Sequence, residues 1–125
     1  MNVWLAVAVG GAAGSVARYG VVRAATAALG VAFPYGTLAV NIFGSFCAGL
    51  LYVLLADRWA ASEAWRGLLL IGFLGGFTTF SAFSLETLRL LESVSAQAAA
   101  ANVALNLLLS IAACALGLWL GRALQ

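Results

Sequence analysis

Polar side chains recur at helical spacing inside runs that are otherwise almost entirely apolar. Two series have a spacing of four residues, which places the members of each on one face of a helix. They are Thr37, Asn41 and Ser45 in the first series, and Asn102, Asn106 and Ser110 in the second. Amide and hydroxyl groups donate hydrogen bonds without a full charge, so they can bind an anion weakly enough to release it. Such stripes either join helices by hydrogen bonds or line a polar path through a membrane.

A third polar cluster is the stretch GGFTTFSAFS at 75–84. Gly75 and Gly76 each cost a helix about 1 kcal/mol relative to alanine, and the β-branched Thr78 and Thr79 add crowding. We therefore expect the helix to break here. A break frees backbone carbonyls, which need a partner inside a membrane, and in other broken helices such carbonyls coordinate Na⁺. The alternative is a local kink repaired by threonine hydroxyls.

Phenylalanines follow through the same stretch at intervals of three, at Phe77, Phe80 and Phe83. This spacing places the rings roughly on one helical face. An aromatic ring has a positive edge, so ring edges turned into a path could stabilise a small anion. Ordinary packing of the rings is the alternative.

The elements that must hold these groups are long apolar spans. The chain has 125 residues, of which 65% are hydrophobic and 8% are charged, whereas soluble domains carry about 25% charged residues. A helix of about 20 apolar residues crosses a bilayer. We expect four such helices in one domain over 1–125, at about 3–22, 35–56, 67–91 and 98–120. The sequence thus predicts an all-α membrane protein whose third helix is broken in mid-span.

The arginines are balanced between the two ends of this four-span plan. The end with both termini and the middle linker has Arg58, Arg66 and Arg122, and the other end has Arg18, Arg23 and Arg89. Because arginine bias sets orientation, this balance favours neither orientation. Either the signal is weak in a short protein, or the chain inserts both ways and pairs with an inverted copy. Arg18 and Arg23 could attract anions to an entrance or reach to the interface as anchors.

Several classes of function lack the residues they need. The chain has no histidine, and it has no visible nucleophile–base pair or cluster of metal ligands, so an enzyme is not expected. Its net charge of +2 is too small to indicate nucleic-acid binding. Cys47 and Cys114 lie in apolar runs and are interpreted as buried free thiols.

Three blocks of sequence resemble those of one known family. They are GGAAGSVARY at 10–19, GTLAVNIFGSF at 36–46 and GGFTTFSAFSLE at 75–86. With the length and the four-span plan, these blocks make the chain resemble the Fluc (CrcB) family of bacterial fluoride channels. The third block is the most specific of the three.

The resemblance implies a dual-topology, antiparallel homodimer in the bacterial inner membrane, which exports fluoride passively through two pores. It implies that the backbone carbonyls of Gly75 and Thr78 hold a central, structural Na⁺ that is not transported. It implies that Phe80 and Phe83 line the pores with their ring edges, and that Asn41 donates its amide nearby. The remaining implied pore positions are Thr37, Ser81, Ser84, Asn106 and Ser110, with Arg18 at a vestibule. Some relatives have a tyrosine and a serine where this chain has Asn102 and Asn106.

Two other functions remain open at this stage. A small dual-topology multidrug/proton antiporter would need a carboxylate deep in the membrane. The first span has no acidic residue, and Glu86 lies toward the end of the third. A non-transporting scaffold protein would not need Asn41, Phe80 or Phe83.

Overall fold

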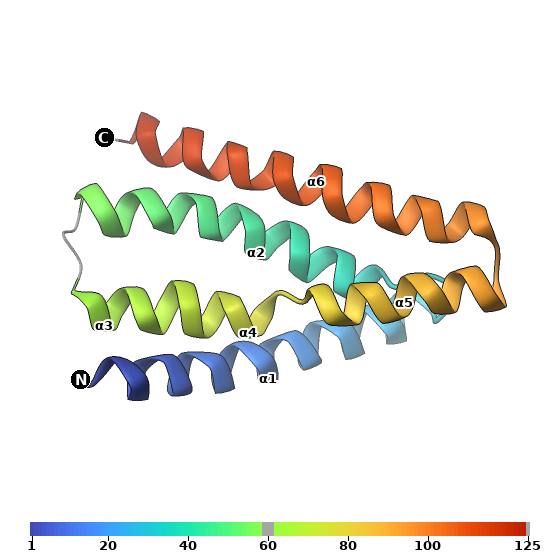
Figure 1. The fold of residues 1–125 in the computed structure, drawn as a ribbon, viewed down its shortest axis with the longest axis horizontal. Helices are drawn as coiled ribbons and strands as arrows, with labels where there is room; N and C mark the ends of the chain where they lie inside the picture. The colour runs from blue at the N-terminus through green and yellow to red at the C-terminus, as the bar shows by residue number, and fades with distance from the viewer. Residues whose placement is uncertain (59–61, 125) are drawn as a thin grey trace.

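The computed structural model describes residues 1–58 and 62–124, and all the regular structure in these ranges is helical (Figure 1). The elements are α1 (Val3–Leu29), α2 (Tyr35–Val53), the π-helix η1 (Leu54–Arg58), α3 (Glu63–Arg66), the π-helix η2 (Gly67–Leu74), α4 (Gly75–Phe77), α5 (Phe80–Ser93) and α6 (Ala96–Ala123). Four stretches are long and apolar enough to cross a membrane: Val3–Leu29, Tyr35–Ala56, Glu63–Ser93 and Ala96–Ala123. The expected all-helical, four-span plan is therefore confirmed.

The first helix is longer than the sequence pattern predicted. It was expected to end near residue 22, and it ends at Leu29. The additional residues, RAATAAL at 23–29, are mostly good helix formers, so the helix continues after the apolar run stops. It ends where Gly30 adopts a φ of 83°, a left-handed conformation that favours glycine.

The long helices form two closely packed pairs, α2 with α6 and α1 with the third stretch (Figure 1). Glycines allow the close approach in both pairs. A Cβ at Gly49 would overlap the Cys114 carbonyl, and one at Gly117 would overlap the Phe46 carbonyl. In the other pair, a Cβ at Gly14 would overlap the carbonyl of Phe73. These glycines therefore serve packing between helices within one copy of the chain.

Both termini lie at the same end of the bundle as the end of η1 and the start of α3 (Figure 1). This is the arrangement on which the arginine count depends, except that Arg18 lies well inside α1 and contacts Gly76 instead of lying near the end of a span. The N-termini of α1 and α6 are capped by side chains. Asn2 Oδ1 accepts a hydrogen bond from the Trp4 amide at 2.8 Å, and Ser95 Oγ accepts one from the Ala98 amide at 3.0 Å.

Two residues in extended conformation lie between α4 and α5. Thr78 has φ −86° and ψ 159°, and Thr79 has φ −155° and ψ 119°. The Thr79 hydroxyl accepts a hydrogen bond from the Ala82 amide at 3.1 Å and so caps α5. The Thr78 hydroxyl donates to the Leu74 carbonyl at 2.8 Å. Threonine side chains therefore satisfy part of the backbone where the helical pattern is interrupted.

Candidate functional site

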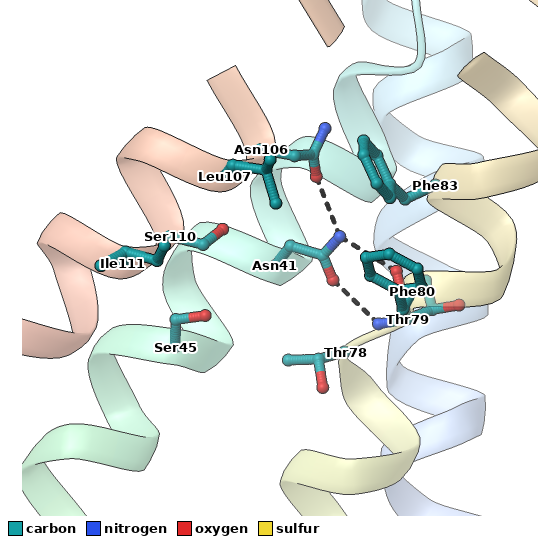
Figure 2. Close-up of a pocket in the computed structure, with 10 residues that line it drawn as sticks. All are labelled: Asn41, Ser45, Thr78, Thr79, Phe80, Phe83, Asn106, Leu107, Ser110 and Ile111. Carbon is teal, nitrogen blue, oxygen red and sulfur yellow. Dashed lines mark hydrogen bonds between the residues drawn. The ribbon is translucent and has the colours of Figure 1, made fainter. Parts of the chain in front are cut away.

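A cavity of about 220 Å³ opens beside the interruption between α4 and α5 (Figure 2). Its lining comes from α2, from α6 and from the segment that begins at Thr78. The lining residues are Asn41, Ser45, Thr78, Thr79, Phe80, Phe83, Asn106, Leu107, Ser110 and Ile111. Most of the residues singled out from the sequence on these three elements thus meet at one place, although they lie far apart along the chain.

The side chain of Asn41 lies at the centre of this cavity wall and pairs with the backbone of Thr79 (Figure 2). Asn41 Oδ1 accepts a hydrogen bond from the Thr79 N–H at 2.8 Å, and Asn41 Nδ2 donates to the Thr79 carbonyl at 3.1 Å. Both backbone groups of Thr79 are therefore satisfied by one amide from α2. The extended conformation can persist because it leaves neither group unpaired in an apolar environment.

This pairing changes the hydrogen bonding of the carbonyls before it. In a continuous α-helix the Thr79 N–H would donate to the Gly75 carbonyl, and the Ala82 N–H would donate to the Thr78 carbonyl. Here these two donors are bound to Asn41 Oδ1 and to Thr79 Oγ1 instead. The carbonyls of Gly75 and Thr78 thus lose their helical donors.

The surroundings of these carbonyls fit a hard cation. Neutral carbonyl oxygens are ligands that Na⁺ accepts in interrupted membrane helices. Gly75 is exposed, and an added Cβ there would meet nothing within 4 Å, so the space beside it is open. Within the described residues, no group of three or more histidine, cysteine, aspartate or glutamate side chains could hold a metal ion.

A third carbonyl in the same turn has a charged partner. Arg18 Nε, from α1, donates to the Gly76 carbonyl at 3.0 Å. Arg18 also lines a neighbouring cavity of about 290 Å³, together with Thr37 and Glu86. This arginine therefore lies between the interrupted segment and a second cavity.

The phenylalanines separate into two environments. Phe80 and Phe83 line the Figure 2 cavity, with ring centroids 5.2 Å apart, and their exposed fractions are 72% and 6%. Phe77 is buried elsewhere and stacks on Phe73, with centroids 5.8 Å apart. The expectation of one face for all three rings is wrong, because the extended Thr78 and Thr79 break the helical periodicity between Phe77 and Phe80.

The two asparagines of α6 continue the hydrogen bonding from Asn41. Asn41 Nδ2 donates to Asn106 Oδ1 at 2.9 Å, and Asn106 Nδ2 donates to both the carbonyl and the Oδ1 of Asn102 at 3.0 Å. Asn102 Nδ2 in turn donates to the Thr87 hydroxyl at 2.9 Å. Asn102 is fully buried and does not line the cavity.

Ser110, one turn further along α6, has no such partner. Its hydroxyl is buried and makes no hydrogen bond with any described residue, yet the side chain lines the cavity. An unpaired buried hydroxyl costs free energy, and a ligand that accepts its hydrogen would recover that cost.

Three of the residues expected at the pore lie outside this cavity. The Thr37 hydroxyl donates to Glu86 Oε1 at 2.8 Å and lies beside the second cavity. The Ser81 hydroxyl is 3.3 Å from that of Thr79, and the Ser84 hydroxyl donates to the Phe80 carbonyl at 2.8 Å. None of these three residues lines the cavity.

The sequence analysis missed two features of the site. It treated Thr79 as a polar side chain of the third cluster and as a residue that weakens a helix, whereas its backbone is the group that Asn41 binds. It also omitted Leu107 and Ile111, the apolar part of the wall. Each directly follows a polar residue of the α6 stripe, so helical periodicity could have indicated them.

Comparison with known proteins gives one consistent result. Residues 5–118 match the family described as CrcB-like protein, Camphor Resistance (CrcB). A relative from Magnetococcus marinus is 53% identical over 116 residues, covering 93% of this chain and 94% of its own. A relative from Coxiella burnetii is 50% identical, and the match covers 97% of this chain and 94% of the relative. A relative from Rhizobium etli is 52% identical, and the match covers 94% of both chains. All three are named fluoride-specific ion channel FluC.

The match extends over nearly the whole chain and includes every element that lines the cavity. Together with the four helices able to cross a membrane, it shows that this chain is a multi-pass membrane protein of the CrcB family.

Proposed function

We propose that the protein is a fluoride-selective channel that lowers cytoplasmic fluoride by passive export. The observation that carries this proposal is the cavity where the ring of Phe80, the ring of Phe83 and the unpaired hydroxyl of Ser110 meet. It presents neutral donors and aromatic rings, and none of its lining residues is charged. The names of the close relatives support fluoride as the ion. No enzymatic activity is proposed.

Neutral groups suit fluoride because this ion is small and strongly hydrated. A selective pore must replace the water shell with close donors, and it must hold the ion weakly enough to let it leave. The Ser110 hydroxyl can donate without breaking an existing bond, and the edges of the phenylalanine rings are electropositive. The path continues past Asn41 and Asn106 toward Thr37, Ser81 and Ser84, with Arg18 at a vestibule.

Two antiparallel copies form the conducting unit in this proposal, with one pore for each copy. A single copy leaves large apolar side chains exposed around the interrupted segment, including Phe43, Ile71 and Phe80. A second copy crossing here would cover them and close the open side of the cavity. The balanced arginines are consistent with insertion in both orientations.

We also propose that a structural Na⁺ lies where the two copies meet, held by the carbonyls of Gly75 and Thr78. The loss of helical donors to both carbonyls supports this assignment. The ion would supply a fixed positive charge that holds the two interrupted segments together. It would not be transported.

The direct test is fluoride efflux from proteoliposomes that contain the purified protein. We expect fluoride to leave rapidly down its gradient while chloride is retained, and flux no greater than that from empty vesicles would refute the proposal. A Glu86→Gln variant distinguishes a proton-coupled antiporter. Fluoride efflux that needs no proton gradient, with or without Glu86, supports a channel, whereas transport that depends on a proton gradient and on Glu86 supports the antiporter.

A further inference from the structure

We infer that Asn102 and Asn106 are positioning residues, which act on the pore by orienting Asn41 and do not bind fluoride themselves. The inference rests on the proposed function, because it assigns roles within the same pore. It is carried by the direction of the hydrogen bonds that join the asparagines.

The direction of this chain of amides is fixed at both of its ends. At one end, the Thr79 N–H can only donate, so Asn41 must turn its oxygen toward Thr79 and its Nδ2 toward Asn106. Asn106 must then present its oxygen to Asn41. At the other end, the backbone carbonyl of Asn102 can only accept, which requires the nitrogen of Asn106 to face it. The two requirements agree, so the orientation of each amide follows from the backbone around it.

In this direction, Asn41 Nδ2 and Asn106 Nδ2 each already have two hydrogen-bond acceptors. A carboxamide has two N–H groups. Those of Asn41 donate to the Thr79 carbonyl and to Asn106 Oδ1. Asn106 Nδ2 donates to the carbonyl and the Oδ1 of Asn102. Either residue would have to break a buried hydrogen bond in order to bind fluoride, whereas Ser110 would break none.

The chain of amides also reaches α5 on the far side of the interruption. Asn102 Nδ2 donates to the Thr87 hydroxyl, which donates to the Phe83 carbonyl at 2.8 Å. One connected set of bonds therefore joins the backbone of Thr79 to the backbone of Phe83, by way of α2 and α6. Loosening Asn106 should disturb the positions of both Thr79 and the Phe83 ring, although Asn106 contacts no ion.

A double-mutant cycle on fluoride efflux tests this assignment. The variants are Asn106→Ala, Asn41→Ala and the combination of the two, with the rate expressed per reconstituted channel. The matched control on α6 is Leu108→Ala, an exposed side chain that does not line the cavity. We expect Asn106→Ala to lower the rate by roughly fivefold or more, as breaking a buried hydrogen bond would. We expect the double variant to match Asn41→Ala within about twofold, because coupled residues are not additive.

The backbone of Thr79 supplies a second readout, which does not depend on transport. In protein labelled with ¹⁵N-threonine, we expect Asn106→Ala to shift the Thr79 amide signal and Leu108→Ala to leave it unchanged. Asn102→Leu should shift the same signal and lower the efflux rate, even though Asn102 does not line the cavity. Where Asn106→Ala does not give monodisperse protein, Thr87→Val breaks the same chain of bonds while keeping the side chain's shape, and we expect a smaller loss.

Three results would overturn the inference. The first is an efflux rate in the double variant that equals the product of the two single losses. The second is a Thr79 amide signal that does not shift in Asn106→Ala. The third is an efflux rate in Asn102→Leu equal to that of the wild type. If the wild-type protein moves no fluoride, the proposed function fails instead, and the Thr79 signal still decides whether the amide chain positions the backbone.

Discussion

The side-chain amide of Asn41 accepts a hydrogen bond from the Thr79 N–H at 2.8 Å and donates one to the Thr79 carbonyl at 3.1 Å. A side chain from α2 thus provides both backbone hydrogen bonds of Thr79, which lies on the third membrane stretch. The pairing resembles that of a neighbouring strand, but it occurs within a helical bundle. It makes an extended backbone tolerable in an apolar environment, and it redirects the donor that would otherwise bind the Gly75 carbonyl. Local stability and the candidate cation site thus depend on one amide.

Asn41→Leu should destabilise the protein and slow fluoride conduction. The leucine has a similar size but leaves two backbone groups of Thr79 unpaired, at a cost of about 2 kcal/mol or more, since each unpaired buried group costs ~1–3 kcal/mol. Unfolding in detergent and fluoride efflux measure the two effects. Tyr52→Leu, at an exposed position of α2, is the matched control. Wild-type stability in Asn41→Leu would show that the pairing contributes little.

Ser110→Ala should separate transport from stability. Removing a buried hydroxyl that has no partner should leave the free energy of unfolding unchanged or slightly higher. Fluoride efflux should fall by about tenfold or more, because loss of one donor to a charged group costs ~1.5–3 kcal/mol. The same efflux assay and melting curve measure both. A destabilised variant with normal efflux would contradict the assigned role.

Gly117→Ala should loosen the contact between α2 and α6. The added methyl would overlap the Phe46 carbonyl, and overpacking of this kind costs about 1–3 kcal/mol. Gly20→Ala on α1 is the control, because its Cβ would meet nothing within 4 Å, and we expect it to be neutral or stabilising by up to about 1 kcal/mol. Thermal unfolding in detergent compares the two. Equal unfolding temperatures for the two variants would mean that α2 and α6 can move apart to accommodate the added methyl group.

Exchange of Na⁺ for a larger organic cation should lower fluoride efflux and weaken the dimer. The proposed ligands are backbone carbonyls, so Thr78→Ser, which keeps the hydroxyl that donates to Leu74, should retain the Na⁺ dependence. Efflux and the fraction of dimer are measured across a series of Na⁺ concentrations. Identical values with and without Na⁺ would remove the ion from the proposal.

The antiparallel arrangement predicts that each end of the chain is found on both sides of the membrane. With Cys47 and Cys114 replaced, a single cysteine introduced near the N-terminus should react partly with an impermeant reagent added outside, and completely after the membrane is opened. Complete or absent labelling in intact vesicles would indicate a single orientation. A single orientation would rule out the antiparallel dimer.

The sequence by itself determined the four helices and most of the residues that line the cavity. Long apolar runs leave a membrane helix as the stable choice for the backbone, and a spacing of four puts Asn41 with Ser45, and Asn106 with Ser110, on one face. Three specific blocks also indicated the family, which the comparisons confirm. These features are local, because hydropathy and periodicity within one helix are enough to produce them.

Only the tertiary structure decided which groups the polar side chains bind. Spacing gives the face of a helix, but it does not say which neighbour that face meets or how an amide is turned. Asn41 therefore could not be matched to the backbone of Thr79, nor Asn102 to Thr87 away from the cavity. Phe77 was expected on the same helical face as Phe80 and Phe83. It lies elsewhere because the extended Thr78 and Thr79 interrupt the helix between Phe77 and Phe80. Thr79 stays extended because Asn41 on α2 supplies both of its backbone hydrogen bonds, a contact between segments 38 residues apart.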